Sequence, residues 1–181
     1  MAIGDSITRV DAYDKVTGRC KYTDDLCPKD ALVAKVLHST IAHGFVKSID
    51  TSEAEKLPGV VKIVTCFDVP DIRFATPGHP WSTDPAHQDK ADRKLLNTHV
   101  RYYGDDVAAV VAEDEITAAQ AIRAIKVEYE ELPFALDVQD SMSGRIPAIQ
   151  EDNPDNILKH TTMDYGNVEE AIKEPGLIKV E

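Results

Sequence analysis

Long hydrophobic runs are absent from this chain of 181 residues. The longest uninterrupted apolar run covers residues 107–112, whereas a helix needs about 20 apolar residues to cross a bilayer. The first residues show neither the basic region nor the apolar region with which a secretory signal begins. We therefore expect a cytoplasmic protein that does not insert into membranes.

Basic residues are scarce relative to acidic ones. Lysine and arginine total 20 against 32 aspartates and glutamates, which gives a formal net charge of −12. A surface that binds nucleic acid or an anionic membrane needs positive charge, so we expect neither as a partner. The hydrophobic fraction of 43% is close to the value for globular domains, and we expect a folded core.

Cysteine is also rare, with Cys20, Cys27 and Cys66 as the three members. An odd number in a chain of this length does not suit a disulfide scaffold, and the sequence predicts reduced thiols. A bridge between Cys20 and Cys27 is the less favoured alternative. We interpret Cys66, which follows a predicted strand, as a buried structural thiol rather than a nucleophile.

Motifs for catalysis and cofactor binding are missing. A phosphate-binding loop needs glycines between a strand and a helix, but three carboxylates follow the run at residues 107–112. The histidine pairs lack the second pair that a zinc site requires, and no acyl-transfer motif occurs. Glu128 and Glu130 alternate along a predicted strand and are interpreted as a solvated face. We expect no catalytic, cofactor-binding or metal-binding residue in this chain.

Hydrophobic patterns predict five strands, each a short apolar run or a stretch of alternating residues, at residues 31–37, 45–50, 60–65, 107–112 and 127–130. Three helix starts are indicated by capping residues: Ser52 before Glu55, Asp114 before Ala118, and Asn167 before Glu170. The first of these helices is expected to end at Pro58-Gly59. The resulting two strand-helix-strand units predict an α/β fold in which helices pack on a mixed sheet.

One long loop between the two units carries residues that suggest contact with a ligand. Residues 68–97 lack periodicity; in the segment that holds Phe74, His79 and Trp81, prolines restrict the backbone and a glycine permits a tight turn. These side chains combine a hydrogen-bonding ring with large stacking surfaces, which favours contact with a planar ligand or a partner chain. The alternative is a hydrophobic plug beneath the loop.

Several strings together resemble one protein family, although each string alone is weak. They are KVTGR at 15–19, YTDD at 22–25, IAHG at 41–44, LPGVV at 57–61, DVP at 68–70, VRYYGD at 100–105, TAA at 117–119 and VEYEELP at 127–133. Their order and spacing resemble the N-terminal part of the molybdenum-binding subunit in the xanthine dehydrogenase and aldehyde oxidase family. The strings DIRFATPGHPW at 71–81 and ADRKLL at 91–96 look most like its bacterial xanthine dehydrogenases.

The resemblance implies the α/β hammerhead domain and an oxidative hydroxylation of purines, from hypoxanthine or xanthine to urate, with a molybdopterin cofactor. Iron–sulfur clusters and FAD would lie on partner domains or subunits. In that family the catalytic glutamate and the loops that hold the pterin lie in a region that follows the hammerhead. No position here matches them, so the isolated chain is expected to be inactive and to bind no molybdopterin.

The expected organisation has three parts: an extended arm at residues 1–30, the hammerhead domain at 31–140, and a turn-rich tail at 141–181. The tail would lead into a downstream molybdopterin-binding domain, because residues 177–181 look like a strand that has only begun. Phe74, His79 and Trp81 would form one wall of the substrate approach. Two alternatives remain: a related molybdenum hydroxylase that acts on aldehydes, nicotinate or another heteroaromatic ring, and a non-catalytic interaction module.

Overall fold

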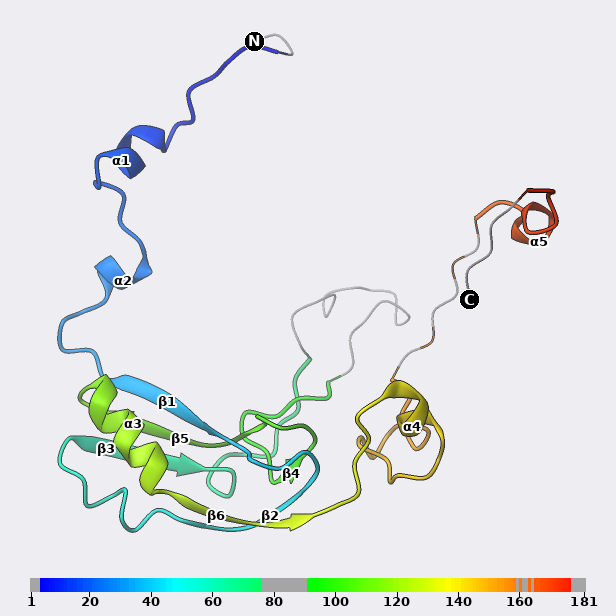
Figure 1. Cartoon of the computed structure of the whole chain (residues 1–181). Helices are drawn as coiled ribbons and strands as arrows, with labels where there is room; N and C mark the ends of the chain where they lie inside the picture. The colour runs from blue at the N-terminus through cyan, green and yellow to red at the C-terminus, as the bar shows by residue number, and fades with distance from the viewer. Residues whose placement is uncertain (1–3, 76–90, 159, 161–162, 164, 177–181) are drawn as a thin grey trace.

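Two small antiparallel sheets form the body of the protein in the computed structural model (Figure 1). The structure describes all residues except 1–3, 76–90, 159, 161–162, 164 and 177–181. The first sheet has the order β1 (Val33–His38), β5 (Asp106–Ala112), β3 (Val60–Thr65). The second has the order β4 (His99–Val100), β2 (Gly44–Asp50), β6 (Lys126–Glu131).

Strand β5 is the centre of the first sheet. Both of its edges are paired, with Val33 opposite Ala112 on β1 and Thr65 opposite Ala108 on β3. The strand is therefore close to uniformly apolar, and Val107 and Val110 are fully buried. Strand β1 alternates between half-buried and exposed residues, as the edge of a sheet with one covered face does.

Helix α3 (Glu115–Ala124) packs on β1 and β5. It begins as expected, because the Asp114 carboxylate accepts a hydrogen bond from the Thr117 backbone N–H at 2.8 Å. Ala118 and Ala121 are fully buried on the face toward the sheet, and their small side chains let the helix approach closely. The sequence prediction of this helix is confirmed.

Two buried clusters form the core and share neighbours. One is centred on Val100 and Val107, and the other on Val110 and Ala121. Leu37, Ile49 and Val127 pack partly buried against both clusters. The two sheets are therefore joined by a continuous apolar interior rather than lying side by side as separate units.

The predicted helix after Ser52 does not form. The chain makes turns there, since the Asp50 carboxylate accepts from the Ser52 N–H at 3.0 Å and Thr51 Oγ1 donates to Glu55 at 2.7 Å. These bonds use the groups that a capping box would need, and Ala54 is drawn into the core with no exposed surface. The first strand-helix-strand unit is therefore wrong as a prediction.

The α/β class itself is confirmed, as are the five predicted strands to within a few residues at each end. The sheet arrangement differs from the expected mixed sheet, because the described strands pair only in the antiparallel sense and in two sheets. Glu128 and Glu130 are exposed, as the alternation predicts. Cys20, Cys27 and Cys66 are free, and Cys66 is buried. Among the described residues, no helix combines the length and apolar character needed to cross a membrane.

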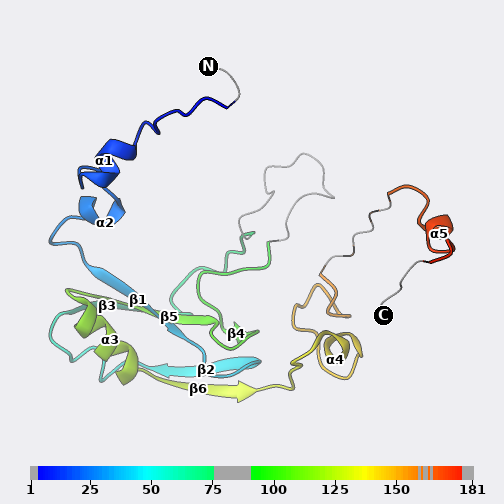
Figure 2. The same ribbon diagram turned by 45° about the horizontal axis from the view of Figure 1, so that its top comes forward.

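Both ends of the described chain extend away from the sheets (Figures 1 and 2). Residues 4–30 carry helices α1 (Ala12–Val16) and α2 (Thr23–Leu26), which the sequence did not predict. After β6 come α4 (Val138–Met142) and α5 (Val168–Ala171), and Asn167 caps α5 as expected. The strand predicted at residues 177–181 lies outside the described residues.

Candidate functional site

The base of the long loop is closed by a short backbone bridge. The Phe74 N–H donates to the Arg93 carbonyl at 2.9 Å, and the Arg93 N–H donates back to the Phe74 carbonyl at 3.2 Å. An ion pair of 2.6 Å between Lys94 and Asp71 reinforces this junction. Phe74 keeps 46% of its surface exposed. The other two residues predicted for this site, His79 and Trp81, lie outside the described residues.

A buried carboxylate organises the polypeptide just beyond this junction. Asp105 is only 3% exposed and accepts three hydrogen bonds: from Asn97 Nδ2 at 2.8 Å, from the Arg101 N–H at 3.1 Å and from the Asp106 N–H at 3.0 Å. Its own backbone pairs with Ser39, whose N–H donates to the Asp105 carbonyl at 2.7 Å. Asp105 therefore fixes the turn that leads into β5.

Burial raises the pKa of Asp105 above its usual value, and the N–H donors of Arg101 and Asp106 oppose that rise. The three donors approach both carboxylate oxygens, and this arrangement favours the ionised form, which accepts all three hydrogen bonds. The group is thus a structural anion whose hydrogen-bonding capacity is largely used, and it is not free to act on a ligand.

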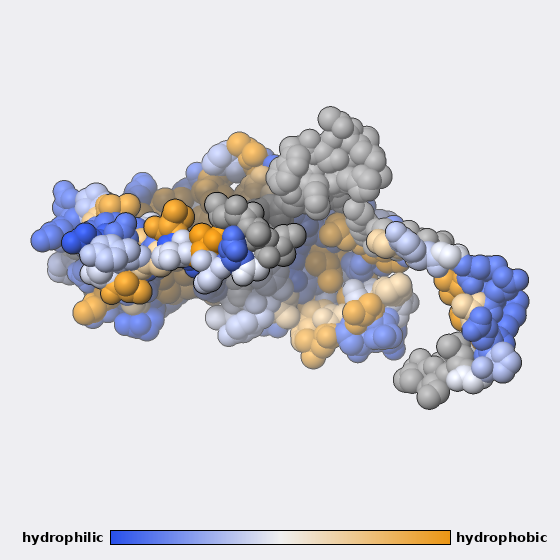
Figure 3. Space-filling model, turned by 90° about the horizontal axis from the view of Figure 1, so that it is seen from above, coloured by the Kyte–Doolittle hydropathy of each residue, from blue (hydrophilic) through white to orange (hydrophobic). Residues whose placement is uncertain are grey.

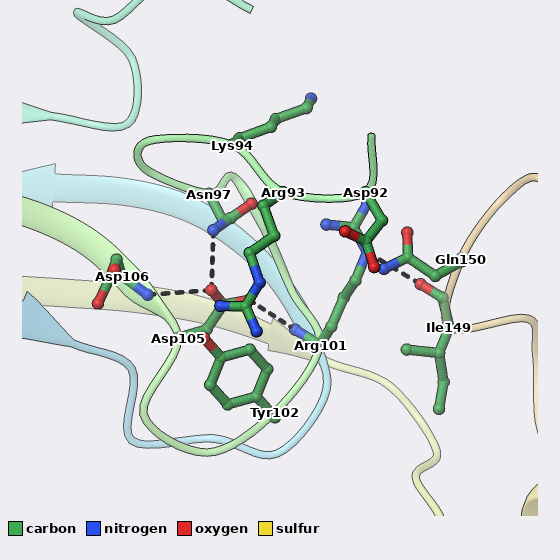
Figure 4. A pocket seen from close by; sticks show the side chains of 10 residues that line it. All are labelled: Asp92, Arg93, Lys94, Asn97, Arg101, Tyr102, Asp105, Asp106, Ile149 and Gln150. Atoms are coloured by element: carbon green, nitrogen blue, oxygen red, sulfur yellow. Dashed lines mark hydrogen bonds between the residues drawn. The ribbon is translucent and has the colours of Figure 1, made fainter. Parts of the chain in front are cut away.

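A polar pocket of about 240 Å³ lies between the segment at residues 92–106 and the chain at Ile149 and Gln150 (Figure 4). Three cationic side chains, three carboxylates and one phenol take part in its lining, which consists of Asp92, Arg93, Lys94, Asn97, Arg101, Tyr102, Asp105, Asp106, Ile149 and Gln150. Burial and the charge of Asp105 raise the pKa of Tyr102, while Arg93 opposes the rise. The pocket shares Arg93 with the bridge to Phe74, so it adjoins the base of the predicted loop.

Arginine side chains tie the tail of the chain to this region. Arg101 Nε donates to the Ile149 carbonyl at 3.0 Å. Arg73, on the opposite side of the loop base, pairs with Asp152 at 2.9 Å and with Glu151 at 3.4 Å. These contacts hold the segment at residues 149–152 against the body and close one side of the pocket.

A pair of histidines links the starts of two strands. His43 immediately precedes β2, and His99 is the first residue of β4. His43 is 2% exposed; its Nδ1 lies 2.8 Å from the Pro133 carbonyl, and its Nε2 lies 3.0 Å from His99 Nε2. A carbonyl only accepts, so His43 Nδ1 carries the proton and the neutral ring accepts a hydrogen bond from His99. That assignment leaves His99 Nδ1 as a buried acceptor without a partner among the described residues.

The environment of His99 favours its neutral form. Burial, the positive charge of Arg101 and the neighbouring His43 lower its pKa to about 4. The ring also stacks on Phe45, with centroids 4.5 Å apart. The hydrogen bond between the two rings links the residue before β2 to the first residue of β4.

The arrangement supports binding and positioning rather than covalent chemistry. Within the part of the chain that the structure describes, no three His, Cys, Asp or Glu side chains converge as a metal site would require. Burial raises the pKa of the Cys66 thiol to about 11, which makes it a poor nucleophile and confirms the structural interpretation. Several of the pocket's charged groups already have partners: Arg101 binds the Ile149 carbonyl, Lys94 pairs with Asp71, and Asp106 pairs with His38.

Sequence reasoning missed the residues that shape this region, namely Asn97, Asp105 and the pair His43 and His99. Asn97 and Asp105 lie eight residues apart in a stretch without periodicity, and His43 and His99 lie 56 residues apart, so local spacing carried no signal for either pairing. One signal was present: Gly104, with a φ of +96°, marks a tight turn immediately before Asp105 and the buried strand.

The fold and this region define a small α/β domain with a polar pocket lined by charged side chains. The family of the aldehyde oxidase and xanthine dehydrogenase a/b hammerhead domain matches residues 17–133. The chain belongs to this family. The match covers most of the described body and agrees with the resemblance found in the sequence strings.

The chain is similar to one part of several longer proteins. The xanthine dehydrogenase molybdenum-binding subunit of Escherichia coli O157:H7 is 48% identical over 91% of this chain but over 22% of its own length. The nicotinate dehydrogenase large molybdopterin subunit of Eubacterium barkeri is 30% identical over 97% of this chain and 39% of its own. The crystal structure of the aldehyde oxidoreductase from Desulfovibrio desulfuricans matches with a TM-score of 0.75 and 31% identity, over 95% of this chain and 19% of that one. The chain thus spans about a fifth of the E. coli relative's length.

Proposed function

We propose that this chain is the N-terminal hammerhead domain of the molybdenum-binding subunit of a xanthine dehydrogenase, a hydroxylase that acts on purines. The observation that carries the proposal is the 48% identity to such a subunit over nearly the whole chain. The domain's own contribution is positional: the Asp105 network, the arginine contacts and the His43–His99 pair fix the loop base and the tail relative to the core.

Molybdopterin would supply the oxidative hydroxylation in such a subunit, and two of the cations that line the pocket of this chain are already engaged. A pterin phosphate needs free cations, yet Lys94 is paired with Asp71 and Arg101 is bound to the Ile149 carbonyl. We therefore propose that the cofactor lies in a molybdopterin-binding domain that follows this chain. Iron–sulfur clusters and FAD would lie on further domains or subunits, and the protein would work in the cytoplasm.

The loop that Phe74 begins is proposed as one wall of the substrate approach. Phe74 is half exposed, and the bridge to Arg93 fixes the point from which the loop leaves the body. Phe74, His79 and Trp81 would present stacking surfaces and a hydrogen-bonding ring to a purine. The residues that choose among ring systems would lie mainly outside this chain.

The wall role is tested by Phe74→Ala and Trp81→Ala in the complete enzyme. Loss of one aromatic contact of about 0.5–1.5 kcal/mol predicts a KM for xanthine raised roughly 2- to 12-fold with a smaller effect on kcat. Ile116→Ala, on the exposed face of α3, is the matched control and should change neither constant. Unchanged KM in both loop variants would refute the role.

A second function is favoured by one specific finding. The nicotinate dehydrogenase subunit matches a larger share of this chain than the xanthine dehydrogenase subunit does, although at lower identity. The alternative is therefore a molybdenum hydroxylase for another heteroaromatic ring or an aldehyde. Assays of the complete complex with xanthine, hypoxanthine, nicotinate and an aldehyde separate the two: we expect the purines to be oxidised fastest, and a preference for nicotinate or the aldehyde would overturn the purine assignment.

A further inference from the structure

The first described segment, residues 4–30, carries large apolar side chains that are not buried against the rest of the structure. Helices α1 and α2, of five and four residues, have no buried residue. Its large apolar side chains are instead exposed: Ile7 62%, Val10 102%, Tyr13 62%, Val16 83%, Tyr22 59% and Leu26 70%. We name this segment the arm.

Helices this short do not persist in water without tertiary contacts, because the cost of nucleation is recovered only over about 12–15 residues. The arm nevertheless has a defined local structure. Arg19 lies over the Tyr13 ring at 5.4 Å, and its N–H donates to the Asp14 carbonyl at 2.9 Å. Asp11 is paired with Arg9 at 2.6 Å and with Lys15 at 2.8 Å. Asp11 is thus neutralised by two cations of the arm itself, while the apolar side chains of the arm stay exposed.

The direction in which the arm projects restricts which parts of a longer polypeptide it can contact. In both ribbon views the arm and the segment that carries α5 leave the sheets toward the same side (Figures 1 and 2). Seen from that side, hydrophobic residues interrupt the hydrophilic surface along the arm (Figure 3). A polypeptide that continues beyond α5 would therefore emerge on the side to which the arm projects.

We propose that the arm docks onto the part of the same polypeptide that follows this chain, through Val10, Tyr13, Val16, Tyr22 and Leu26. The inference rests on the proposed function for the existence of that further part, which in the E. coli relative amounts to most of its length. A second copy of this chain is a poorer occupant, because a net charge of −12 on each copy opposes self-association. Docking would attach the hammerhead domain to the downstream region at two points, through the arm and through the covalent connection.

Hydrogen exchange measured by mass spectrometry tests the docking directly. In the isolated 181-residue chain, amides of residues 8–26 should exchange at nearly the rate of an unfolded peptide; in the full-length polypeptide they should be slowed at least about tenfold. Peptides from β5 and α3 should be protected in both and serve as internal controls. An arm that exchanges equally fast in both proteins would overturn the proposal.

Substitutions locate the contact. Val10→Asp or Val16→Asp in the full-length polypeptide should restore fast exchange to the whole arm, whereas Val16→Ile should leave it protected. Ile116→Asp, at an equally exposed apolar position on α3, is the matched control and should leave the arm protected. Undiminished protection in both aspartate variants would refute this contact surface.

Other occupants give distinct results. Protection that rises with the concentration of the isolated chain would show a second copy on the arm, and protection that needs a separate subunit would show a different chain; either result contradicts the proposal. Molybdenum content and xanthine oxidation are measured on the same samples. If the arm is protected in a full-length protein that neither holds molybdenum nor oxidises xanthine, the docking proposal stands and the proposed function is rejected. If the protein holds molybdenum and oxidises xanthine but the arm is not protected, only the docking proposal is rejected.

Discussion

At the scale of single residues, the most consequential group is a buried carboxylate that is hydrogen-bonded by the chain itself. Asp105 accepts hydrogen bonds from Asn97, Arg101 and Asp106 while 3% of its surface is exposed. A buried anion is tolerated only when such donors surround it. Its role is to fix the turn between the pocket and β5, and the geometry of the whole polar region depends on it.

Replacing Asp105 by asparagine should therefore destabilise the fold. The amide turns one acceptor into a donor that faces an N–H, which leaves a buried polar group unsatisfied at a cost of about 1–3 kcal/mol. Urea unfolding of the 181-residue chain measures the loss. Asp106→Asn, whose side chain is 42% exposed and pairs with His38, should cost much less. Equal losses in the two variants would contradict the assignment.

His99 should make the fold sensitive to acid. Burial lowers its pKa to about 4, whereas an unfolded histidine titrates near 6.5. Between these values the unfolded chain binds more protons, so the stability from neutral His99 is complete above about pH 6.5 and is lost as the pH falls toward 4. The raised pKa of Asp105 acts in the opposite direction, because its contribution is lost as the pH rises.

The His99 contribution is isolated by comparing variants. Urea midpoints measured from pH 7 to pH 4.5 should fall more steeply for the unmodified chain than for His99→Gln. His38→Gln, at an exposed histidine on β1, should keep the steep profile. A profile that is unchanged in His99→Gln would show that other groups cause the acid sensitivity.

At the scale of elements, the junction of β2 and β6 permits very little change. A Cβ added at Gly44 would lie 2.3 Å from the Glu130 carbonyl oxygen and 2.8 Å from the Ile41 side chain. The backbone oxygen cannot move without opening the pairing of Gly44 with Glu131. The absence of a side chain at this position is thus a requirement of the second sheet.

Gly44→Ala should accordingly destabilise the chain by about 1–3 kcal/mol, the usual cost of forcing extra atoms into a packed interior. Thermal unfolding followed by circular dichroism measures it. Ser48→Ala, an exposed position on the same strand, should change the midpoint little even though it removes the hydrogen bond to Glu128. A midpoint for Gly44→Ala as high as that of the unmodified chain would contradict the close approach of the two strands.

Elements set by local signals were predictable, and those set by distant contacts were not. The β-branched run at residues 60–65 and the Asp114 cap carry their structure in neighbouring residues, and β3 and α3 form as expected. Ser52 and Glu55 have the spacing of a capping box, but Asp50 and Thr51 compete for the same groups. The two-residue strand β4 exists only because β2 pairs with it, and no pattern of two residues could reveal that.

The candidate site divides in the same way. Phe74 was recognisable as an aromatic residue in a proline-restrained loop, and the structure places it at the loop base. The pocket beside it depends on Asn97 with Asp105 and on Arg101 with Ile149, and the second pair lies 48 residues apart in sequence. Such pairings are decided by the packing of sheets and tail, so composition and spacing could not indicate them.

At the scale of the whole molecule, the described residues form a folded body flanked by an arm and a tail whose helices contain no buried residue. The chain spans 22% of the length of the xanthine dehydrogenase subunit from E. coli O157:H7. Among the described residues, no three His, Cys, Asp or Glu side chains converge as a metal site would require. Under the proposed function, the hammerhead domain would position a loop, a tail and an arm for the domains around it.

The most direct measurement is a domain replacement in the E. coli subunit. This chain is substituted for the matching segment, and molybdenum content and xanthine oxidation are measured on the purified protein beside the isolated 181-residue chain. We predict that the chimera holds stoichiometric molybdenum and oxidises xanthine within about tenfold of the parent, equivalent to ~1.4 kcal/mol, and that the isolated chain does neither. A folded chimera without activity, or stoichiometric molybdenum in the isolated chain, would contradict the assignment.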